Sequence, residues 1–287
     1  SLVQLPTGGG KSICYQLPAL AKKGVCLVFS PLIALMKDQV DQLKKLGISA
    51  IAIHSGLTSN ELGVEMQNIV NEKYKFVYLS PERGSSQLFR TYLKQINISF
   101  FVVDEAHCVS QWGHQFRPEY LKIGELRALS SDSNIIAVTA TANRDVKNDI
   151  VKYLKLKPNY QSYISSFRRS NLSYIVIEDN NNIRKLLDIL SKVKGSSIVY
   201  VNTRKKASEI SDLLNKNKIS ACYYHAGLDM KQREAIQSKW IKNKERVIVS
   251  TNAFGMGIDK PDVRLVVHFD IPSSPEAYYQ EAGRAGR

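Results

Sequence analysis

The chain carries a glycine-rich stretch close to its start, Thr7-Gly8-Gly9-Gly10-Lys11-Ser12, between a short apolar run and a segment with helical periodicity. Three consecutive glycines let the backbone curl so that several N–H groups point at one anion, and the N-terminal end of the following helix adds to the attraction. Lys11 can then reach the β- and γ-phosphates of ATP, and the Ser12 hydroxyl can bind Mg²⁺. The strict phosphate-loop pattern has a glycine where this chain has Leu5, so the match rests on the Gly-Lys-Ser core.

A pair of adjacent carboxylates, Asp104 and Glu105, follows the apolar run Phe100–Val103. We expect Asp104 to hold Mg²⁺ through a water molecule and Glu105 to orient and deprotonate the water that attacks the nucleotide. Adjacent carboxylates are common on surface loops, but a pair at a strand end in the same unit as a Gly-Lys-Ser loop indicates nucleotide hydrolysis. His107 is expected to link this site to the rest of the protein.

Short β-branched runs alternate with longer helical patterns along the chain. The predicted strands are Val25–Ser30, Ile48–His54, Phe76–Ser80, Phe100–Asp104, Ile135–Thr139, Tyr174–Ile177, Ser197–Val201, Ala221–His225, Val247–Thr251 and Leu265–Phe269. The predicted helices include Ser12–Ala21, Ile33–Leu46, Arg144–Leu154, Ile183–Val193, Lys205–Asn217 and Met230–Lys242. This alternation predicts parallel sheets with helices on both faces. The rhythm breaks over residues 157–170, so we expect two α/β domains, 1–165 and 166–287.

Composition points to a globular protein with a polyanionic partner. The 287 residues include 40 Lys and Arg against 26 Asp and Glu, a net charge of +14 that favours nucleic acid. The apolar fraction of 44% excludes disorder as the main state, and no run is long enough for a membrane span. The four cysteines are widely spaced without a CxxC pair, so we expect neither a disulfide framework nor a zinc site.

The stretch Ser110–Tyr120, directly after Asp-Glu-Ala-His, resembles the aromatic-rich loop of the RecQ family of superfamily 2 helicases. The resemblance covers nearly the whole chain and implies two tandem RecA-like P-loop domains with parallel sheets, truncated at both chain ends. In that family the loop senses single-stranded DNA and couples it to ATP hydrolysis. Trp112 and Phe116 offer faces for base stacking, worth about 1–3 kcal/mol per base.

Other stretches resemble family motifs in the family's order: Ser30–Gln39 (motif Ia), Thr139–Ala142 (III), Val199–Arg204 (IV), Ser250–Pro261 (V) and Gln280–Arg287 (VI). The resemblance implies DNA-binding or coupling roles for Ser30, Lys37, His107, Gln111, Trp112, His114, Phe116, Arg117, Thr139, Thr141, Asn202, Arg204 and Thr251. It implies nucleotide binding by Asp259 and Gln280. Arg284 and Arg287 would stabilise the charge on the transferred phosphoryl group, a role worth about 10³–10⁵ in rate in related machines.

RecQ proteins also carry an adenine-reading segment before the phosphate loop, and a zinc module and often a winged helix after motif VI. This sequence contains none of these, so we expect residues 1–287 to unwind DNA weakly or not at all.

The leading hypothesis is a motor that uses ATP to move 3′ to 5′ on single-stranded DNA and to unwind partly duplex DNA in repair or recombination. The direction comes from the resemblance alone. One alternative is an RNA-dependent ATPase of a neighbouring family, and another is a nucleotide-gated DNA-binding module without turnover. A generic P-loop kinase would not need a second unit carrying arginines. The composition weakly favours a bacterial cytoplasm over a nucleus, and the sequence does not identify protein partners.

Overall fold

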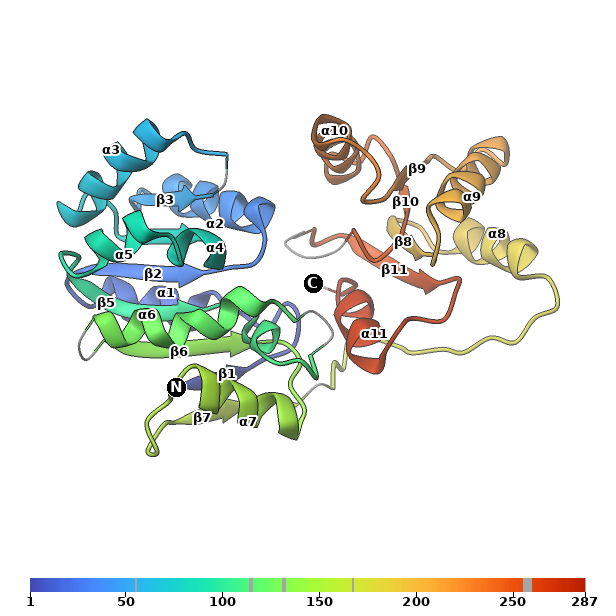
Figure 1. Ribbon diagram of the computed structural model, residues 1–287. Coiled ribbons are helices and arrows are strands. Elements are labelled where there is room, and N and C mark those ends of the chain that lie inside the picture. Colours follow the sequence, from blue (N-terminus) through green and yellow to red (C-terminus); the bar gives the residue numbers. More distant parts are fainter. Residues whose placement is uncertain (55, 114–115, 131–132, 167, 255–259, 287) are drawn as a thin grey trace. The chain divides into compact units, whose positions relative to one another are not determined.

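Two units of alternating strands and helices make up the chain, Ser1–Phe167 and Arg168–Arg287. The computed structural model describes residues 1–54, 56–113, 116–130, 133–166, 168–254 and 260–286 (Figure 1). His114, Asp259 and Arg287, which the sequence analysis assigns to the site, lie outside the described residues. In the part of the chain that is described, no helix has the length and apolar composition needed to cross a membrane.

The first unit is built on a parallel sheet with the strand order β3-β4-β2-β5-β6-β1-β7. Its strands are β1 Leu2–Gln4, β2 Val25–Phe29, β3 Ala50–Ile53, β4 Phe76–Leu79, β5 Ile98–Val103, β6 Asn134–Thr139 and β7 Ser162–Ile164. All five residues of β2 are buried, as expected for a strand covered on both faces. Because the strands are parallel, their carboxyl ends meet at one edge of the sheet, where α/β proteins bind ligands.

Helices cover both faces of this sheet. They are α1 Ile13–Leu20, α2 Ile33–Lys45, α3 Ser59–Val70, α4 Pro81–Gly84, α5 Gln87–Leu93, α6 Ile123–Leu129 and α7 Arg144–Tyr153, with short 3₁₀ turns at Ala106–Val109 and Pro118–Lys122. Helices α1 and α2 contribute to one apolar cluster, and α3, α5, α6 and α7 contribute to the other. The local sequence supports these helices: Thr58 and Glu61, for example, form a reciprocal capping box at the start of α3.

The second unit has a smaller parallel sheet, with the order β11-β8-β10-β9. Its elements are α8 Asn182–Lys192, β8 Ser196–Tyr200, α9 Arg204–Lys216, β9 Ala221–Tyr224, α10 Met230–Ile241, β10 Val247–Ser250, β11 Val263–His268 and α11 Pro275–Ala282. Helices α8 and α9 pack on one face of the sheet, while Trp240 of α10 and Phe254 belong to the cluster on the other face. The predicted α/β fold with parallel sheets is confirmed.

One predicted strand is wrong. Residues Tyr174–Ile177 form no strand, and the Val176 side chain is 93% exposed. A strand is stable only when a neighbouring strand satisfies its N–H and C=O groups. The described residues pair no strand with this segment, so its β-branched composition alone does not make it one. The other predicted strands and helices begin and end within two residues of the observed elements.

Candidate functional site

The glycine-rich loop leaves β1 at the carboxyl edge of the first sheet and leads directly into α1. Gly10 has a φ of +79°, a left-handed conformation that favours glycine. A Cβ atom at Gly9 would lie 2.9 Å from the Pro6 carbonyl oxygen, so this close backbone approach also requires glycine. Ser12 occupies the N-cap position of α1. The loop therefore has the tight backbone and the adjacent helix N-terminus of an anion-binding turn.

Asp104 and Glu105 follow β5 at the same edge. Burial of the carboxyl group, and after it the charge of Glu105, raise the pKa of Asp104 to about 7, while the charge of Lys11 opposes this rise. The structure thus brings Lys11 close enough to act on a carboxylate far away in sequence. Glu105 has a φ of +48°, a left-handed conformation that is rare for a non-glycine residue and is often found at functional sites.

The groups around Asp104 suit a magnesium ion. Magnesium prefers hard oxygen ligands, commonly one or two carboxylates together with hydroxyl, water and phosphate oxygens. Asp104 supplies a buried carboxylate whose Oδ1 accepts a hydrogen bond from the Glu105 backbone at 2.9 Å. Ser12 supplies a half-buried hydroxyl at the start of α1. These two residues fit the ion that the sequence predicts.

A line of polar contacts runs from Glu105 to the end of β6. His107 Nδ1 lies 3.3 Å from Glu105 Oε2 and 3.0 Å from the Thr139 hydroxyl. The Thr139 hydroxyl in turn donates to the Thr141 carbonyl at 3.0 Å. His107, Thr139 and Thr141 are all buried. These contacts connect Glu105 to the segment after β6, which resembles motif III.

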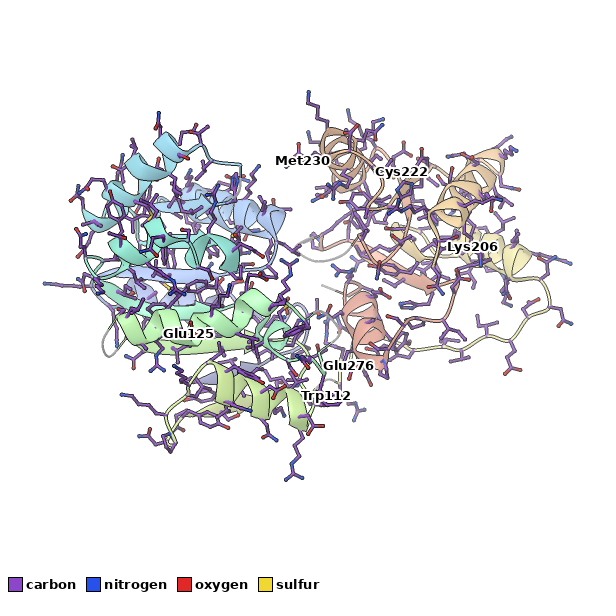
Figure 2. All side chains as sticks on the ribbon, viewed as in Figure 1. Trp112, Glu125, Lys206, Cys222, Met230 and Glu276 are labelled. Atoms are coloured by element: carbon purple, nitrogen blue, oxygen red, sulfur yellow. The ribbon has the colours of Figure 1, made fainter. Side chains whose placement is uncertain are left out.

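The aromatic-rich loop, Ser110–Tyr120, begins shortly after this histidine. Trp112, labelled in Figure 2, is 76% exposed. Its backbone N–H donates to the Ser110 hydroxyl at 3.2 Å, and that hydroxyl donates to Asp149 of α7 at 2.6 Å. A Cβ atom at Gly113 would lie only 2.5 Å from the His107 carbonyl oxygen, so the loop closely approaches the residue that contacts Glu105. A solvent-facing ring is thus carried by a backbone fixed to the carboxylate site.

Phe116 and Arg117 complete the described part of this loop and are half-buried. The Arg117 backbone N–H donates to the Cys108 carbonyl at 2.9 Å, which returns the chain to the first unit's core. Its guanidinium lies 3.9 Å from the Glu82 carboxylate, at the long end of ion-pair distances.

The predicted site residues differ in exposure. Exposed are Gly8, Gly9, Gly10, Lys37, Gln111, Trp112, Asn202 and Arg204. Half-buried are Thr7, Lys11, Ser12, Glu105, Phe116, Arg117 and Thr251. Buried are Ser30, Asp104, His107, Thr139, Thr141, Gln280 and Arg284. Ser30 differs from its expected DNA-facing position, because it is 1% exposed.

In the second unit, Asn202 and Arg204 lie at the junction of β8 and α9. The Asn202 backbone N–H donates to the Asp270 carboxylate at 2.8 Å, which joins the ends of the neighbouring strands β8 and β11. The Arg204 guanidinium lies against Gly227, where a Cβ atom would be 2.8 Å from one of its nitrogens. Both side chains are exposed at the carboxyl edge of the second sheet.

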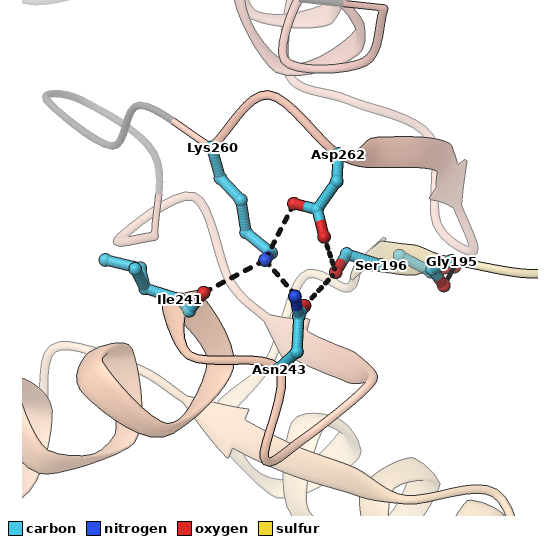
Figure 3. Close-up of polar contacts among 7 residues, drawn as sticks. Gly195, Ser196, Ile241, Asn243, Lys260 and Asp262 are labelled. Carbon is cyan, nitrogen blue, oxygen red and sulfur yellow. Dashed lines mark hydrogen bonds and ion pairs between the residues drawn. The ribbon is translucent and has the colours of Figure 1, made fainter.

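The stretch that resembles motif V is anchored on both sides of its undescribed middle. Before it, the Tyr200 hydroxyl donates to the Phe254 carbonyl at 2.9 Å. After it, the Lys260 ammonium, 3% exposed, donates to the Asn243 side chain at 2.7 Å and pairs with Asp262 at 2.7 Å (Figure 3). The buried Trp240 ring contacts both anchors, with Phe254 at 5.3 Å between ring centroids and the Lys260 ammonium at 5.2 Å.

Replacing Lys260 with methionine should lower the free energy of unfolding by about 1–3 kcal/mol, because hydrogen bonds to a buried charge are lost. Urea denaturation followed by circular dichroism measures the change. The matched control is Lys206→Met, which removes an ion pair to Asp270 and a contact with Phe269 from a more exposed position. We expect the control to lose about 0–1 kcal/mol. Equal losses in the two variants would contradict a special role for the Lys260 anchor.

Arg284 and Gln280, in the stretch that resembles motif VI, lie in the interior of the second unit. Arg284 is 7% exposed. Burial raises the pKa of Tyr200 to about 12, an effect that the charge of Arg284 opposes. Glu281, on α11, contacts His268 at 2.9 Å. The expected role of Arg284 at the nucleotide stays a prediction.

Comparisons with known proteins identify the family. The DEAD/DEAH box helicase model matches residues 1–149, more than half of the chain, and the model of the helicase conserved C-terminal domain matches residues 180–287. The chain belongs to the DEAD/DEAH box helicase family.

Within this helicase family, similar curated proteins include RecQ helicases, so the predicted resemblance is confirmed. The ATP-dependent DNA helicase RecQ of Pasteurella multocida is 45% identical over 288 residues, which cover 100% of this chain and 45% of that protein. The RecQ helicase of Bacillus subtilis is 44% identical over 285 residues, which cover 99% of this chain and 48% of that protein. The chain thus spans about half the length of these relatives.

Solved helicase structures share the fold. The DUF1998 helicase MrfA bound to DNA superposes with a TM-score of 0.78 at 22% identity, covering 100% of this chain and 42% of that one. Yeast Dbp5 bound to RNA and ADP BeF3 superposes with a TM-score of 0.76 at 19% identity, covering 100% of this chain and 75% of that one. Because one of these proteins is bound to DNA and the other to RNA, the fold alone does not distinguish the two nucleic acids.

Three residues without a predicted role of their own, Tyr15, Tyr78 and Lys260, make buried polar contacts near site residues. The only signal for Lys260 was its place in a motif, and no signal marked the tyrosines.

Proposed function

We propose that the chain is the motor of an ATP-dependent DNA helicase, which moves 3′ to 5′ on single-stranded DNA and unwinds partly duplex DNA in repair or recombination. The observation that carries the proposal is that Lys11, Asp104 and Glu105 converge at the carboxyl edge of the first sheet, and that the exposed Trp112 follows them in the same segment of chain as the carboxylates. The names of the RecQ relatives support DNA as the substrate. DNA as the substrate would place the protein in a bacterial cytoplasm, or in a nucleus if the source is eukaryotic.

In the proposed reaction, the N–H groups of residues 7–12 and the Lys11 ammonium bind the phosphates of ATP. Ser12 and Asp104 would hold a magnesium ion, which supplies positive charge to the β- and γ-phosphate oxygens. Glu105 orients a water molecule and takes its proton as the water oxygen bonds to the γ-phosphorus. The bond from that phosphorus to the β–γ bridging oxygen breaks, and ADP and phosphate leave. Asp259, Gln280, Arg284 and Arg287 are proposed to contact the nucleotide from the second unit.

Coupling to DNA would use the contacts around His107. A base stacked on Trp112 would restrict the position of a loop whose backbone approaches the His107 carbonyl. His107 in turn contacts both Glu105 and Thr139. DNA in place would thereby favour the productive position of Glu105. Lys37 in the first unit, and Asn202, Arg204 and Thr251 in the second, are proposed to hold the DNA backbone.

The test compares nucleic acids as activators of ATP hydrolysis by the intact protein. Single-stranded DNA is expected to raise ATP turnover by about 10- to 100-fold, a usual range for coupled sites, and RNA of the same length much less. A phosphate-release assay at fixed salt measures both, because salt strongly changes nucleic-acid affinity. Stronger stimulation by RNA would instead favour the RNA-dependent ATPase.

A further inference from the structure

Four polar side chains, which come from α1, β4 and α2 of the first unit, are connected in series by hydrogen bonds. The hydroxyl oxygens of Tyr15 and Tyr78 are 3.3 Å apart. The Gln16 side-chain amide donates to the Tyr78 hydroxyl at 3.2 Å and to the Gln39 side-chain oxygen at 3.2 Å. The four side chains therefore link the helix that follows the phosphate loop to helix α2.

Packing alone does not account for these hydroxyl groups. Tyr15 and Tyr78 are each 1% exposed and belong to an apolar cluster with residues such as Val28 and Met36. Burial raises the pKa of Tyr15 well above its usual value and that of Tyr78 to about 12, so both stay neutral. Phenylalanine would fill the same space without the cost of burying a hydroxyl group. A buried polar network in such a cluster instead fixes one arrangement of the elements that it joins.

The two ends of this series of hydrogen bonds lie close to two different predicted sites. At one end, the backbone N–H groups of Tyr15 and Gln16 donate to the Ser12 carbonyl at 3.3 Å and 3.0 Å, so both residues lie in the first turn after the phosphate loop. At the other end, Gln39 lies on α2, two residues after the exposed Lys37. Both belong to the stretch Ser30–Gln39, which resembles the DNA-facing motif Ia.

A nucleotide bound by residues 7–12 would act first on this turn of α1. A shift of the turn would move the Tyr15 hydroxyl and the Gln16 amide together, because both side chains start from it. The Tyr78 hydroxyl and the Gln39 side chain are their hydrogen-bond partners, so the shift would change the contacts between α1 and α2.

We propose that Tyr15, Gln16, Tyr78 and Gln39 act as positioning residues that link Ser12 in the phosphate loop to helix α2, so that nucleotide binding changes the affinity for DNA. This proposal rests on the proposed function, because it assumes that the protein binds both ligands. Coupling of this kind is reciprocal: whatever factor the nucleotide applies to DNA affinity, DNA applies to nucleotide affinity.

The test measures the Kd of the intact protein for a fluorescent oligothymidylate by anisotropy, without nucleotide and with a non-hydrolysable ATP analogue plus Mg²⁺. The ratio of the two Kd values is the coupling factor, and it does not depend on turnover. Tyr78→Phe removes the hydroxyl that Tyr15 and Gln16 share and should reduce the coupling factor by about fivefold, the value of roughly one hydrogen bond. The Kd without nucleotide should change little.

The matched control is Tyr74→Phe, which removes a hydroxyl of the same unit that donates to Glu65 at 2.8 Å, away from both sites. This variant should keep the wild-type coupling factor. Gln39→Leu should lose coupling as Tyr78→Phe does. Gln39→Glu keeps an acceptor oxygen for Gln16 and should retain the coupling factor, although its negative charge weakens DNA binding in both states.

Two failures can be told apart. A wild-type protein that binds neither DNA nor ATP would overturn the proposed function, and with it the proposed coupling through the four side chains. Normal binding with wild-type coupling factors in Gln39→Leu and Tyr78→Phe would overturn only the coupling through these side chains. Gln39 is half-buried, so Gln39→Leu should fold even if loss of the Tyr78 hydroxyl destabilises the core. The coupling factor of Gln39→Leu then tests the proposal by itself.

Discussion

Glutamine in place of Glu105 should lower kcat for DNA-stimulated ATP hydrolysis by about 10²–10⁴-fold, the usual contribution of a general base, while ATP still binds. Glutamine has nearly the same shape but cannot take the proton of the attacking water. The groups proposed to bind the phosphates lie in residues 7–12, which follow another strand, and are unchanged by the substitution. Steady-state phosphate release measures kcat, and titration with a fluorescent ATP analogue measures binding.

The matched control is Glu125→Gln, which removes the same charge from the same unit. Glu125 (Figure 2) forms an ion pair of 3.8 Å with Arg90, at an exposed position. Its loss should leave kcat unchanged, because such pairs contribute little. Unchanged hydrolysis in Glu105→Gln would support the other hypothesis, a nucleotide-gated DNA-binding module without turnover.

The phosphate loop and the carboxylate pair could be predicted because each is a contiguous motif at a strand end. Parallel pairing then brings strand ends together without further information, since every carboxyl end lies at the same edge. The effect of Lys11 on the pKa of Asp104 agrees with this reasoning. Side-chain direction could not be predicted in the same way: Ser30 also follows a strand, yet it faces the interior.

Contacts between residues distant in sequence carry the rest of the site. Tyr15 and Tyr78 read as apolar core residues because nothing local shows that their hydroxyl groups meet. Lys260 is surrounded by polar residues in the sequence, and only the fold places its ammonium between Asn243 and Asp262. A pattern-based prediction recovers periodicity, but it does not recover the partners of a single polar atom.

Short strands show the same limit. β1 and β7 have three residues each, too few for a periodic pattern. They form strands because Leu2–Gln4 pairs with β6 on one side and with Ser162–Ile164 on the other. The sequence analysis placed the second of these segments in the break between the domains. Conversely, Tyr174–Ile177 has strand composition but no strand partner among the described residues. Pairing, which is a non-local property, decided both cases.

Trp112→Ala should reduce the stimulation of ATP turnover by single-stranded DNA by about tenfold or more, with a change in DNA Kd of at most about tenfold. One base–aromatic stack is worth roughly 1–3 kcal/mol, whereas backbone contacts from several residues supply most of the affinity. Phosphate release as a function of DNA concentration gives both the maximal stimulation and the DNA concentration at half-stimulation. Anisotropy without nucleotide gives the Kd independently.

The expected split between coupling and affinity follows from how the loop is held. Trp112 is exposed, but its backbone N–H donates to Ser110, and Ser110 donates to Asp149. A base that stacks on the ring therefore contacts a side chain whose backbone is held in place. That backbone runs past the His107 carbonyl at Gly113, and His107 contacts Glu105. Trp112→Phe keeps a stacking face and should restore most of the stimulation. Loss of all DNA affinity in Trp112→Ala would make this ring the main DNA contact, and the sensing role would then be wrong.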